Sequence, residues 1–138
     1  MRPVLLATLG SGVMVLTVSA AMGDVIRDAA ADADDVAAGH ALYESKCSGC
    51  HSLDTDRIGP RHRSVVGRTI ASITEYDYSQ ALQQLGGTWT TARLDQFLSG
   101  TQQMAPGSKM YLEIDDPVQR RLIISYLQSV SRPGGDKQ

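Results

Sequence analysis

The chain has 138 residues, which is enough for one domain. It carries 13 Lys and Arg against 15 Asp and Glu, a formal net charge of −2, so no strong basic field indicates a nucleic-acid partner. Aromatic residues make up only 5% of the chain, which is sparse for a core built from side chains alone.

The N-terminus has the pattern of an export signal. Arg2 supplies the positive start, residues 4–22 carry no charge, and Val18-Ser19-Ala20 offers small residues for cleavage after the alanine. The alternative is an uncleaved membrane anchor, because an uncharged run of this length comes close to the ~20 residues that a membrane helix needs. Glycines and hydroxyl residues interrupt the run, so we expect a signal peptide over residues 1–20.

Residues 21–35 are predicted to be an acidic linker. Five aspartates lie there among alanines, with Arg27 as the only base. The segment has little to bury, which is typical of disorder, and it would tether a mobile head if the anchor were kept.

From Val36 onward, eleven basic residues stand against ten acidic ones, or about +1. The bases that cluster here form either a solvated surface or a docking patch for an acidic redox partner. They are Lys46, Arg57, Arg61, Arg63 and Arg68.

The folded domain is expected to begin with a helix over residues 36–46, capped by Asp35. A glycine inside a helix costs roughly 1 kcal/mol against alanine, so Gly39 indicates a place where another helix approaches closely.

The sequence Cys47-Ser48-Gly49-Cys50-His51 follows this helix directly. Residues three apart lie on one face of a helical turn, so both thiols can reach the two vinyl groups of one porphyrin. His51 can then place an imidazole nitrogen on the iron, and the pattern predicts covalent attachment of one c-type haem. A redox disulfide would need a strand and a βαβ setting, and a zinc site would need four ligands.

Residues 52–78 read as a long irregular segment. Ile58-Gly59-Pro60 predicts a turn, and a carbonyl there could accept the outer N–H of a metal-bound histidine. Several side chains in and after this segment are either packing groups or donors to buried haem propionates. They are Arg68, Tyr76, Tyr78 and Trp89.

Three further helices complete the prediction, and no strand pattern is convincing. Ser79 would cap a helix over residues 80–85, and Thr90 would cap one that ends at Gly100. The last begins with Asp116 as its cap and Pro117 at its first position. Its apolar face would comprise Leu122, Ile123, Tyr126, Leu127 and Val130.

Methionine can be the second axial ligand of a low-spin c-type haem, although a methionine is more often a core residue. Two candidates compete. Met110 follows a Pro-Gly turn that would hold an extended loop over the haem, whereas Met104 would lie at the frayed end of a helix.

From Val36 to Ser131 the sequence resembles the class I c-type cytochromes, the mitochondrial-type proteins and their bacterial soluble relatives. The matching segments occur in the family's order: CSGCH, IGP, VVGR, YDYSQAL, GGTWT, PGSKM and LIISYL. The resemblance implies an all-α domain of three to five helices over residues 36–131, followed by a flexible tail over residues 132–138.

The resemblance also implies the site. Cys47 and Cys50 would bind haem covalently, and His51 and Met110 would be the axial ligands. Pro60 would accept the N–H of His51, and Gly39 would lie where the first and last helices cross, against Ile123 and Tyr126. The propionates would be surrounded by Arg68, Tyr78, Trp89 and Ser108.

Three residues depart from the family pattern. Phe97 replaces a tyrosine and Leu82 an asparagine on the methionine side, which should alter the hydrogen bonding that tunes the potential. His62 replaces a buried leucine, and we expect a satisfied structural histidine rather than a rival ligand.

The implied function is one-electron transfer, not enzyme catalysis, by a monomer in the bacterial periplasm. The donor would be a quinol-oxidising membrane complex, and the acceptor an oxidase or reaction centre. The alternative is a c-haem enzyme or gas-binding protein whose methionine ligand is labile.

Overall fold

The structure is a computed structural model that describes the backbone of residues 19–132 and the side chains of residues 32–132. It contains five helices: α1 (Ser19–Lys46), α2 (Gln80–Leu85), α3 (Thr91–Ser99), α4 (Thr101–Met104) and α5 (Pro117–Ser129). Within the described backbone the only β pairing is one bridge between Thr69 and Thr88, so the all-α prediction is confirmed. Most of the predicted signal, and the tail after Arg132, lie outside the described residues.

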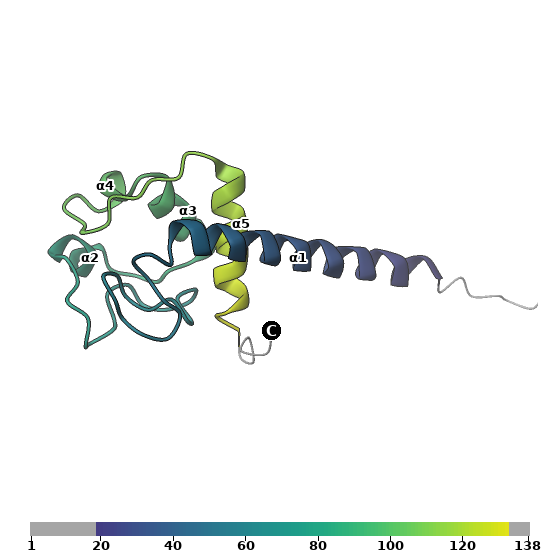
Figure 1. The fold of residues 1–138 in the computed structure, drawn as a ribbon, viewed down its shortest axis with the longest axis horizontal. Coiled ribbons are helices and arrows are strands. Elements are labelled where there is room, and N and C mark those ends of the chain that lie inside the picture. Colours follow the sequence, from purple (N-terminus) through teal and green to yellow (C-terminus); the bar gives the residue numbers. More distant parts are fainter. Residues whose placement is uncertain (1–18, 133–138) are drawn as a thin grey trace, which may run out of the picture.

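Helix α1 is much longer than the sequence predicted. It runs unbroken from Ser19 to Lys46, and its N-terminal half projects away from the rest of the domain (Figure 1). Residues 21–35 therefore form helix in this structure, consistent with the high helix propensity of alanine. The prediction that Asp35 caps the helix is wrong, because Asp35 lies inside α1 and pairs with Arg121 on α5. Between residues 19 and 132, no helix is both long enough and apolar enough to cross a membrane.

Helices α1 and α5 cross at Gly39, as predicted. A Cβ added at Gly39 would lie 2.0 Å from the carbonyl oxygen of Leu122 and 3.0 Å from Cβ of Tyr126. The backbones can approach this closely only because Gly39 has no side chain. This crossing places the end of α1, where the cysteine motif begins, against the centre of α5 (Figure 1).

The three predicted N-caps after the motif are present. The side chains of Ser79, Thr90 and Asp116 accept hydrogen bonds from backbone N–H groups of Leu82, Arg93 and Val118, respectively. Each cap satisfies a donor that the first turn of the helix leaves unpaired.

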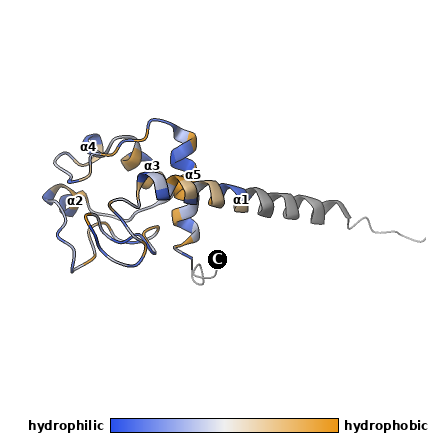
Figure 2. Cartoon of the chain, viewed as in Figure 1, coloured by the Kyte–Doolittle hydropathy of each residue, from blue (hydrophilic) through white to orange (hydrophobic). Residues whose placement is uncertain are grey.

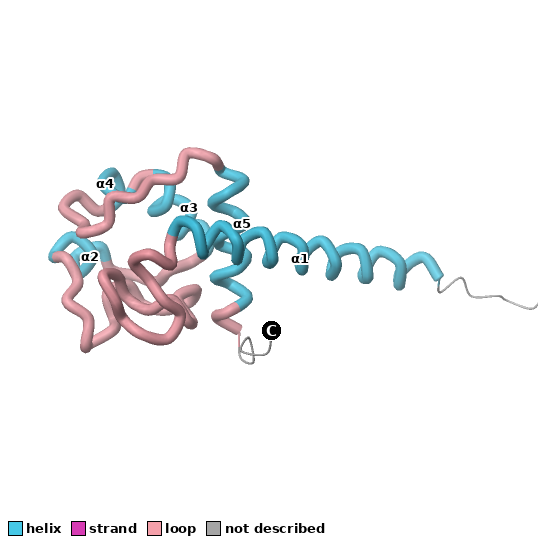
Figure 3. The backbone as a smooth tube through the Cα atoms, in the orientation of Figure 1, coloured by secondary structure: helices cyan, strands magenta, loops and turns pink. Residues whose placement is uncertain are grey.

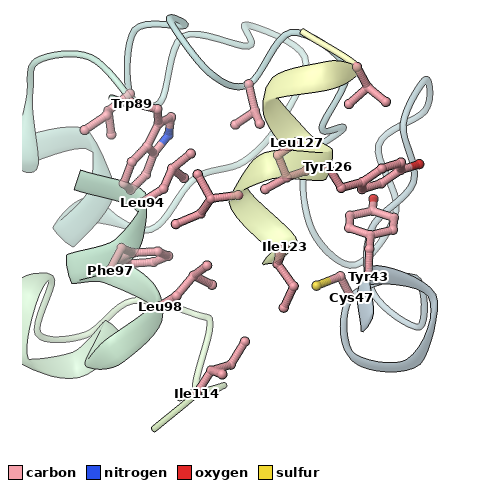
Figure 4. Close-up of a cluster of buried hydrophobic side chains, with 14 of the residues drawn as sticks. Tyr43, Cys47, Trp89, Leu94, Phe97, Leu98, Ile114, Ile123, Tyr126 and Leu127 are labelled. Carbon is pink, nitrogen blue, oxygen red and sulfur yellow. The ribbon is translucent and has the colours of Figure 1, made fainter. Parts of the chain in front are cut away.

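The core lies between the end of α1, α3 and α5. Figure 4 shows Tyr43 and Cys47 from α1 and the turn after it on one side, and Trp89, Leu94 and Phe97 on the other. Hydrophobic and hydrophilic residues are mixed along α3 and α5 (Figure 2). The buried ones belong to this core: Leu94, Phe97 and Leu98 of α3, and Ile123, Ile124, Tyr126 and Leu127 of α5. The Cys47 sulfur points toward Ile123, so the motif is attached to the core itself.

The segment between α1 and α2 is irregular, as expected (Figure 3). Within it, His62 N donates to the Ser52 carbonyl (2.9 Å), and Trp89 N, which lies beyond α2, donates to the Arg68 carbonyl of the segment (2.9 Å). This segment, without regular structure of its own, forms one wall of the site described next.

Candidate haem site

One cavity of about 370 Å³ lies in the interior of the domain. Its lining includes every residue that the sequence predicted for the site. These are Cys47, Cys50, His51, Arg68, Tyr78, Trp89, Ser108 and Met110. Apolar side chains from α3 and α5, such as Leu94, Leu98 and Leu127, complete the walls. The predicted residues, which span Cys47 to Met110 in sequence, are thus brought to a single hollow.

The cysteine turn continues α1 by one tight turn. The N–H of Cys47 donates to the Tyr43 carbonyl (2.8 Å), and the N–H groups of Cys50 and His51 donate to the Cys47 carbonyl (3.0 and 2.9 Å). Cys47 is buried and Cys50 is exposed. Burial raises the pKa of the Cys47 thiol to about 11, so this sulfur is protonated at neutral pH.

His51 is oriented by Pro60. The two atoms His51 Nδ1 and Pro60 O are 2.8 Å apart. Because a carbonyl oxygen only accepts, Nδ1 carries the proton and Nε2 retains a lone pair for a metal. Burial lowers the pKa of His51, with the bond to Pro60 opposing the shift, so the imidazole is neutral as a ligand must be.

The His51 ring also packs against Gly59. A Cβ added there would lie 2.2 Å from Cε1 of His51, so only glycine leaves room for this ring position. The Gly59 N–H in turn donates to the Cys50 carbonyl (2.9 Å), which ties the Pro60 turn to the cysteine turn.

His62 stacks on His51, with ring centroids 3.9 Å apart and an interplanar angle of 21°. Part of the His62 ring lines the cavity, but its Nδ1 is buried and has no hydrogen-bond partner among the described residues. The prediction of a satisfied histidine is therefore wrong at this atom. Burial lowers the pKa of His62 well below its usual value, and the neighbouring His51 and Arg68 lower it further.

Met110 is one of the lining residues, whereas Met104 is not. Met104 ends α4 and packs at the edge of the hydrophobic core instead. The loop before Met110 is closed by a local bond, in which Ser108 Oγ accepts from the Met110 N–H (3.2 Å). The exposed Lys109 donates to Asp77 (2.7 Å), which joins this loop to the segment before α2.

Arg68 is a charged donor in the wall, beside Lys46 and Lys109. Its guanidinium donates to the carbonyls of Arg61 (2.8 Å) and Arg63 (3.3 Å), and these bonds fix it in place. Burial lowers the pKa of Arg68, while Tyr78 opposes this shift. Tyr76, also considered as a donor, instead donates to the Ile58 carbonyl (2.6 Å).

Phe97 and Leu82, the two apolar departures from the family pattern, both line the cavity. Phe97 packs against Trp89 with ring centroids 5.1 Å apart. The cavity wall is therefore apolar at both positions.

This donor set fits a covalent haem. Two thiols lie at one edge, an imidazole with a free Nε2 and a thioether lie on the lining, and the remaining wall is mostly apolar with a few N–H and O–H donors. A flat, apolar macrocycle with charged propionates requires this combination of packing surface and hydrogen-bond donors.

Comparisons with known proteins agree with this reading. The sequence model of the family described as Cytochrome c matches residues 36–131. A cytochrome c homolog of Rickettsia typhi is 42% identical over 88 residues, which are 61% of this chain and 50% of the relative. Cytochrome c2 of Agrobacterium tumefaciens is 36% identical over 100 residues, 67% of this chain and 89% of the relative. The solved structure of cytochrome cH from Methylobacterium extorquens matches with a TM-score of 0.65 and 35% identity, covering 69% of this chain and 98% of that one.

The chain therefore belongs to the cytochrome c family, and its cofactor is one covalent haem c, with Cys47 and Cys50 as the cysteines of the attachment motif. It spans about half the length of several of the curated relatives that it matches, among them the cytochrome c-type cyt cy of Rhodobacter capsulatus, which is 32% identical and of which 54% is covered.

Some residues of the site carry no signal in the sequence. Ile58 and Tyr111 line the cavity and are also 77% and 75% exposed. Gln102 bonds the methionine loop three times. Ile58 belongs to the Ile58-Gly59-Pro60 turn that the sequence predicted. Tyr111 and Gln102 belong to no motif, so only the folded arrangement identifies them.

Proposed function

We propose that the protein is a one-electron carrier whose haem is ligated by His51 and Met110. The observation that carries this proposal is that His51, with its Nε2 left free, and Met110 both line the cavity that holds the two cysteines. When bound, haem iron supplies a ferric–ferrous couple that changes by one electron.

The two side chains would suit that couple. A neutral imidazole held by Pro60 is a stable ligand, and a thioether is a soft, neutral donor that favours the ferrous state. With both axial positions filled, the site would have no position for a substrate on the iron. An electron carrier needs this closure, whereas an enzyme or a gas-binding protein needs an open position.

The partner would dock where the cavity reaches the surface. Cys50, Ile58 and Tyr111 line the cavity and are exposed there, so they offer an apolar face next to the haem edge. Two bases of the predicted docking patch and one base of the methionine loop are paired with acids, which weakens the patch. The pairs are Arg61 with Asp56, Arg63 with Asp54, and Lys109 with Asp77. We infer docking to membrane redox complexes of a bacterial periplasm, through apolar contact more than through charge.

The test is the absorption spectrum of the oxidised protein. A methionine–iron charge-transfer band should be present, should vanish in Met110→Ala, and should persist in the matched variant Met104→Ala. Reduced protein should also leave carbon monoxide unbound. High-spin iron and ready binding of carbon monoxide in the unmodified protein would establish the enzyme or gas-binding alternative instead.

A further inference from the structure

The side chain of Gln102 makes three hydrogen bonds to the loop that carries Met110. Its Nε2 donates to the carbonyl oxygens of Ser108 (3.0 Å) and Met110 (2.8 Å), and its Oε1 accepts from the Gly107 N–H (3.1 Å). Both hydrogens and the oxygen of the Gln102 amide thus form hydrogen bonds with one loop, residues 107–110. A primary amide is suited to this role, because it carries two donors and an acceptor in one plane.

Gln102 is itself held on a fixed support. It lies in α4, which follows α3 after the single residue Gly100 and packs against α3. Thr101 before it is completely buried, and Ala105 after it is buried and donates its N–H to the Thr101 carbonyl (2.9 Å). The contacts of Gln102 therefore connect the rigid α3–α4 unit to the loop over the cavity.

Besides a backbone hydrogen bond from the Ser108 N–H to the Ala105 carbonyl (2.9 Å), the methionine loop is held to the rest of the domain by an exposed ion pair. Lys109 donates to Asp77, but these side chains are 57% and 93% exposed. Ion pairs this exposed contribute little and are screened by salt. Gln102 is half-buried and uncharged, so its bonds persist across pH and salt.

We propose that Gln102 is a positioning residue that holds the Met110 loop closed, and so limits how readily Met110 leaves the iron. The inference rests on the proposed function, in which Met110 is the axial ligand. Without the Gln102 contacts the loop would open more often, and an outside ligand such as imidazole would compete better for the vacated position.

The experiment compares Gln102→Leu, which keeps the bulk and removes all three bonds, with Gln103→Leu on the exposed side of the same short helix. Imidazole binding to the oxidised holoprotein is followed through loss of the methionine–iron band. Gln102→Leu is expected to bind imidazole roughly tenfold more tightly than the wild type, since each lost bond is of modest strength but all three act on one loop. Gln103→Leu is expected to match the wild type.

A second readout does not depend on the ligand. Exchange of the Gly107 amide hydrogen, measured by NMR, should become faster in Gln102→Leu, while the unfolding transition of the whole domain stays in place. Gln102→Glu separates the contacts, because a carboxylate can still accept from Gly107 but faces the Ser108 and Met110 carbonyls without a donor. In Gln102→Glu the Gly107 amide should remain protected from exchange, while imidazole should still displace Met110 more readily than in the wild type. This variant replaces Gln102→Leu in the test if Gln102→Leu does not incorporate haem.

Equal imidazole affinity and equal Gly107 exchange in Gln102→Leu and the wild type would overturn the inference, as would equal loosening in Gln103→Leu. Failure of the proposed function looks different. A wild type without any methionine–iron band removes Met110 as the ligand, and the inference about its release falls with it, whatever the Gly107 amide shows.

Discussion

The orientation of His51 depends on two neighbouring residues of one turn. Pro60 supplies the carbonyl that fixes which ring nitrogen carries the proton, and Gly59 supplies the space that the ring occupies. The two roles are separate, because one is a hydrogen bond and the other is the absence of a side chain. A change at Gly59 therefore tests ring placement without removing the hydrogen-bond acceptor.

Gly59→Ala is expected to push the His51 imidazole away, because the new methyl group would lie 2.2 Å from Cε1. Because the imidazole ring of His51 must shift to make room, ligation of the haem iron by this histidine should weaken. The yield of low-spin haem protein should fall several-fold. Absorption spectra and haem-stained yield measure both effects. Gly49→Ala is the control, because no atom lies within 4 Å of a Cβ added at that position of the neighbouring turn. Equal yields of low-spin protein from the two variants would contradict this account.

Among the elements, α1 and α5 determine the position of the cysteine motif. Their crossing at Gly39 fixes where α1 ends, and Cys47 follows one residue after that end. Tyr43 and Tyr126 pack beside the crossing with ring centroids 5.2 Å apart, and both are buried (Figure 4). The crossing is therefore both a packing contact and the support of the haem attachment site.

Gly39→Ala should destabilise the folded domain strongly. The added methyl group would meet the Leu122 carbonyl at 2.0 Å, and a backbone atom inside a helix cannot move aside cheaply. We expect a loss of roughly 3 kcal/mol in the free energy of unfolding, the upper part of the range for overpacking. Denaturant unfolding followed by circular dichroism measures it.

Ala38→Leu is the matched control for this prediction. Ala38 precedes Gly39 in the same helix but is exposed, and exposed substitutions usually change stability by less than about 0.5 kcal/mol. If Gly39→Ala and Ala38→Leu unfolded at the same denaturant concentration, the close contact at the helix crossing would not be the cause of the loss of stability.

At the scale of the whole molecule, the hydrophobic core surrounds a cavity. Leu94, Phe97 and Ile123 belong both to the core cluster and to the cavity lining. Protein interiors are normally close-packed, so a hollow of this size among core residues indicates that haem completes the core as well as the site.

A chain that cannot attach haem is therefore expected to lose its fixed tertiary packing. In the double variant Cys47→Ser, Cys50→Ser, near-ultraviolet circular dichroism should be largely lost, and thermal unfolding should show no cooperative transition. Some helix should remain in the far-ultraviolet spectrum, because the alanine-rich α1 has high intrinsic propensity. A sharp thermal transition in this variant would show that the side chains alone form a complete core.

Arg61, Arg63 and Lys109 are each paired with an acid, and the chain from Val36 onward carries only about one net positive charge, which predicts a weak salt effect on electron transfer. Oxidation of the reduced protein by a small anionic iron complex should slow by less than about threefold between about 20 and about 200 mM salt. Asp77→Asn removes the acid that faces Lys109, so the rate at low salt should rise and its salt dependence should steepen. A steep dependence in the unmodified protein would instead support a basic docking patch.

Features of this protein that depend on neighbouring residues could be predicted from its sequence. The haem motif depends on residues within one turn, and the caps at Ser79, Thr90 and Asp116 depend on side chains two or three residues from their partners. Such interactions need no knowledge of the rest of the fold. Gly39 was also predictable, because a glycine inside a helix is costly unless it permits a close contact.

Other features were decided by contacts between distant segments. Residue patterns alone left Met104 and Met110 as competitors, and the family resemblance favoured Met110. The path of the loop after α4 brings Met110 to the cavity wall. His62 lies eleven residues beyond His51, yet the irregular segment folds back and stacks the two rings, leaving Nδ1 without a partner. Residues 21–35 form helix continuous with α1 although their composition favoured a linker. The physical reason is that helices and caps are set by neighbours along the chain, whereas loops without periodic structure take their positions from the surfaces they pack against.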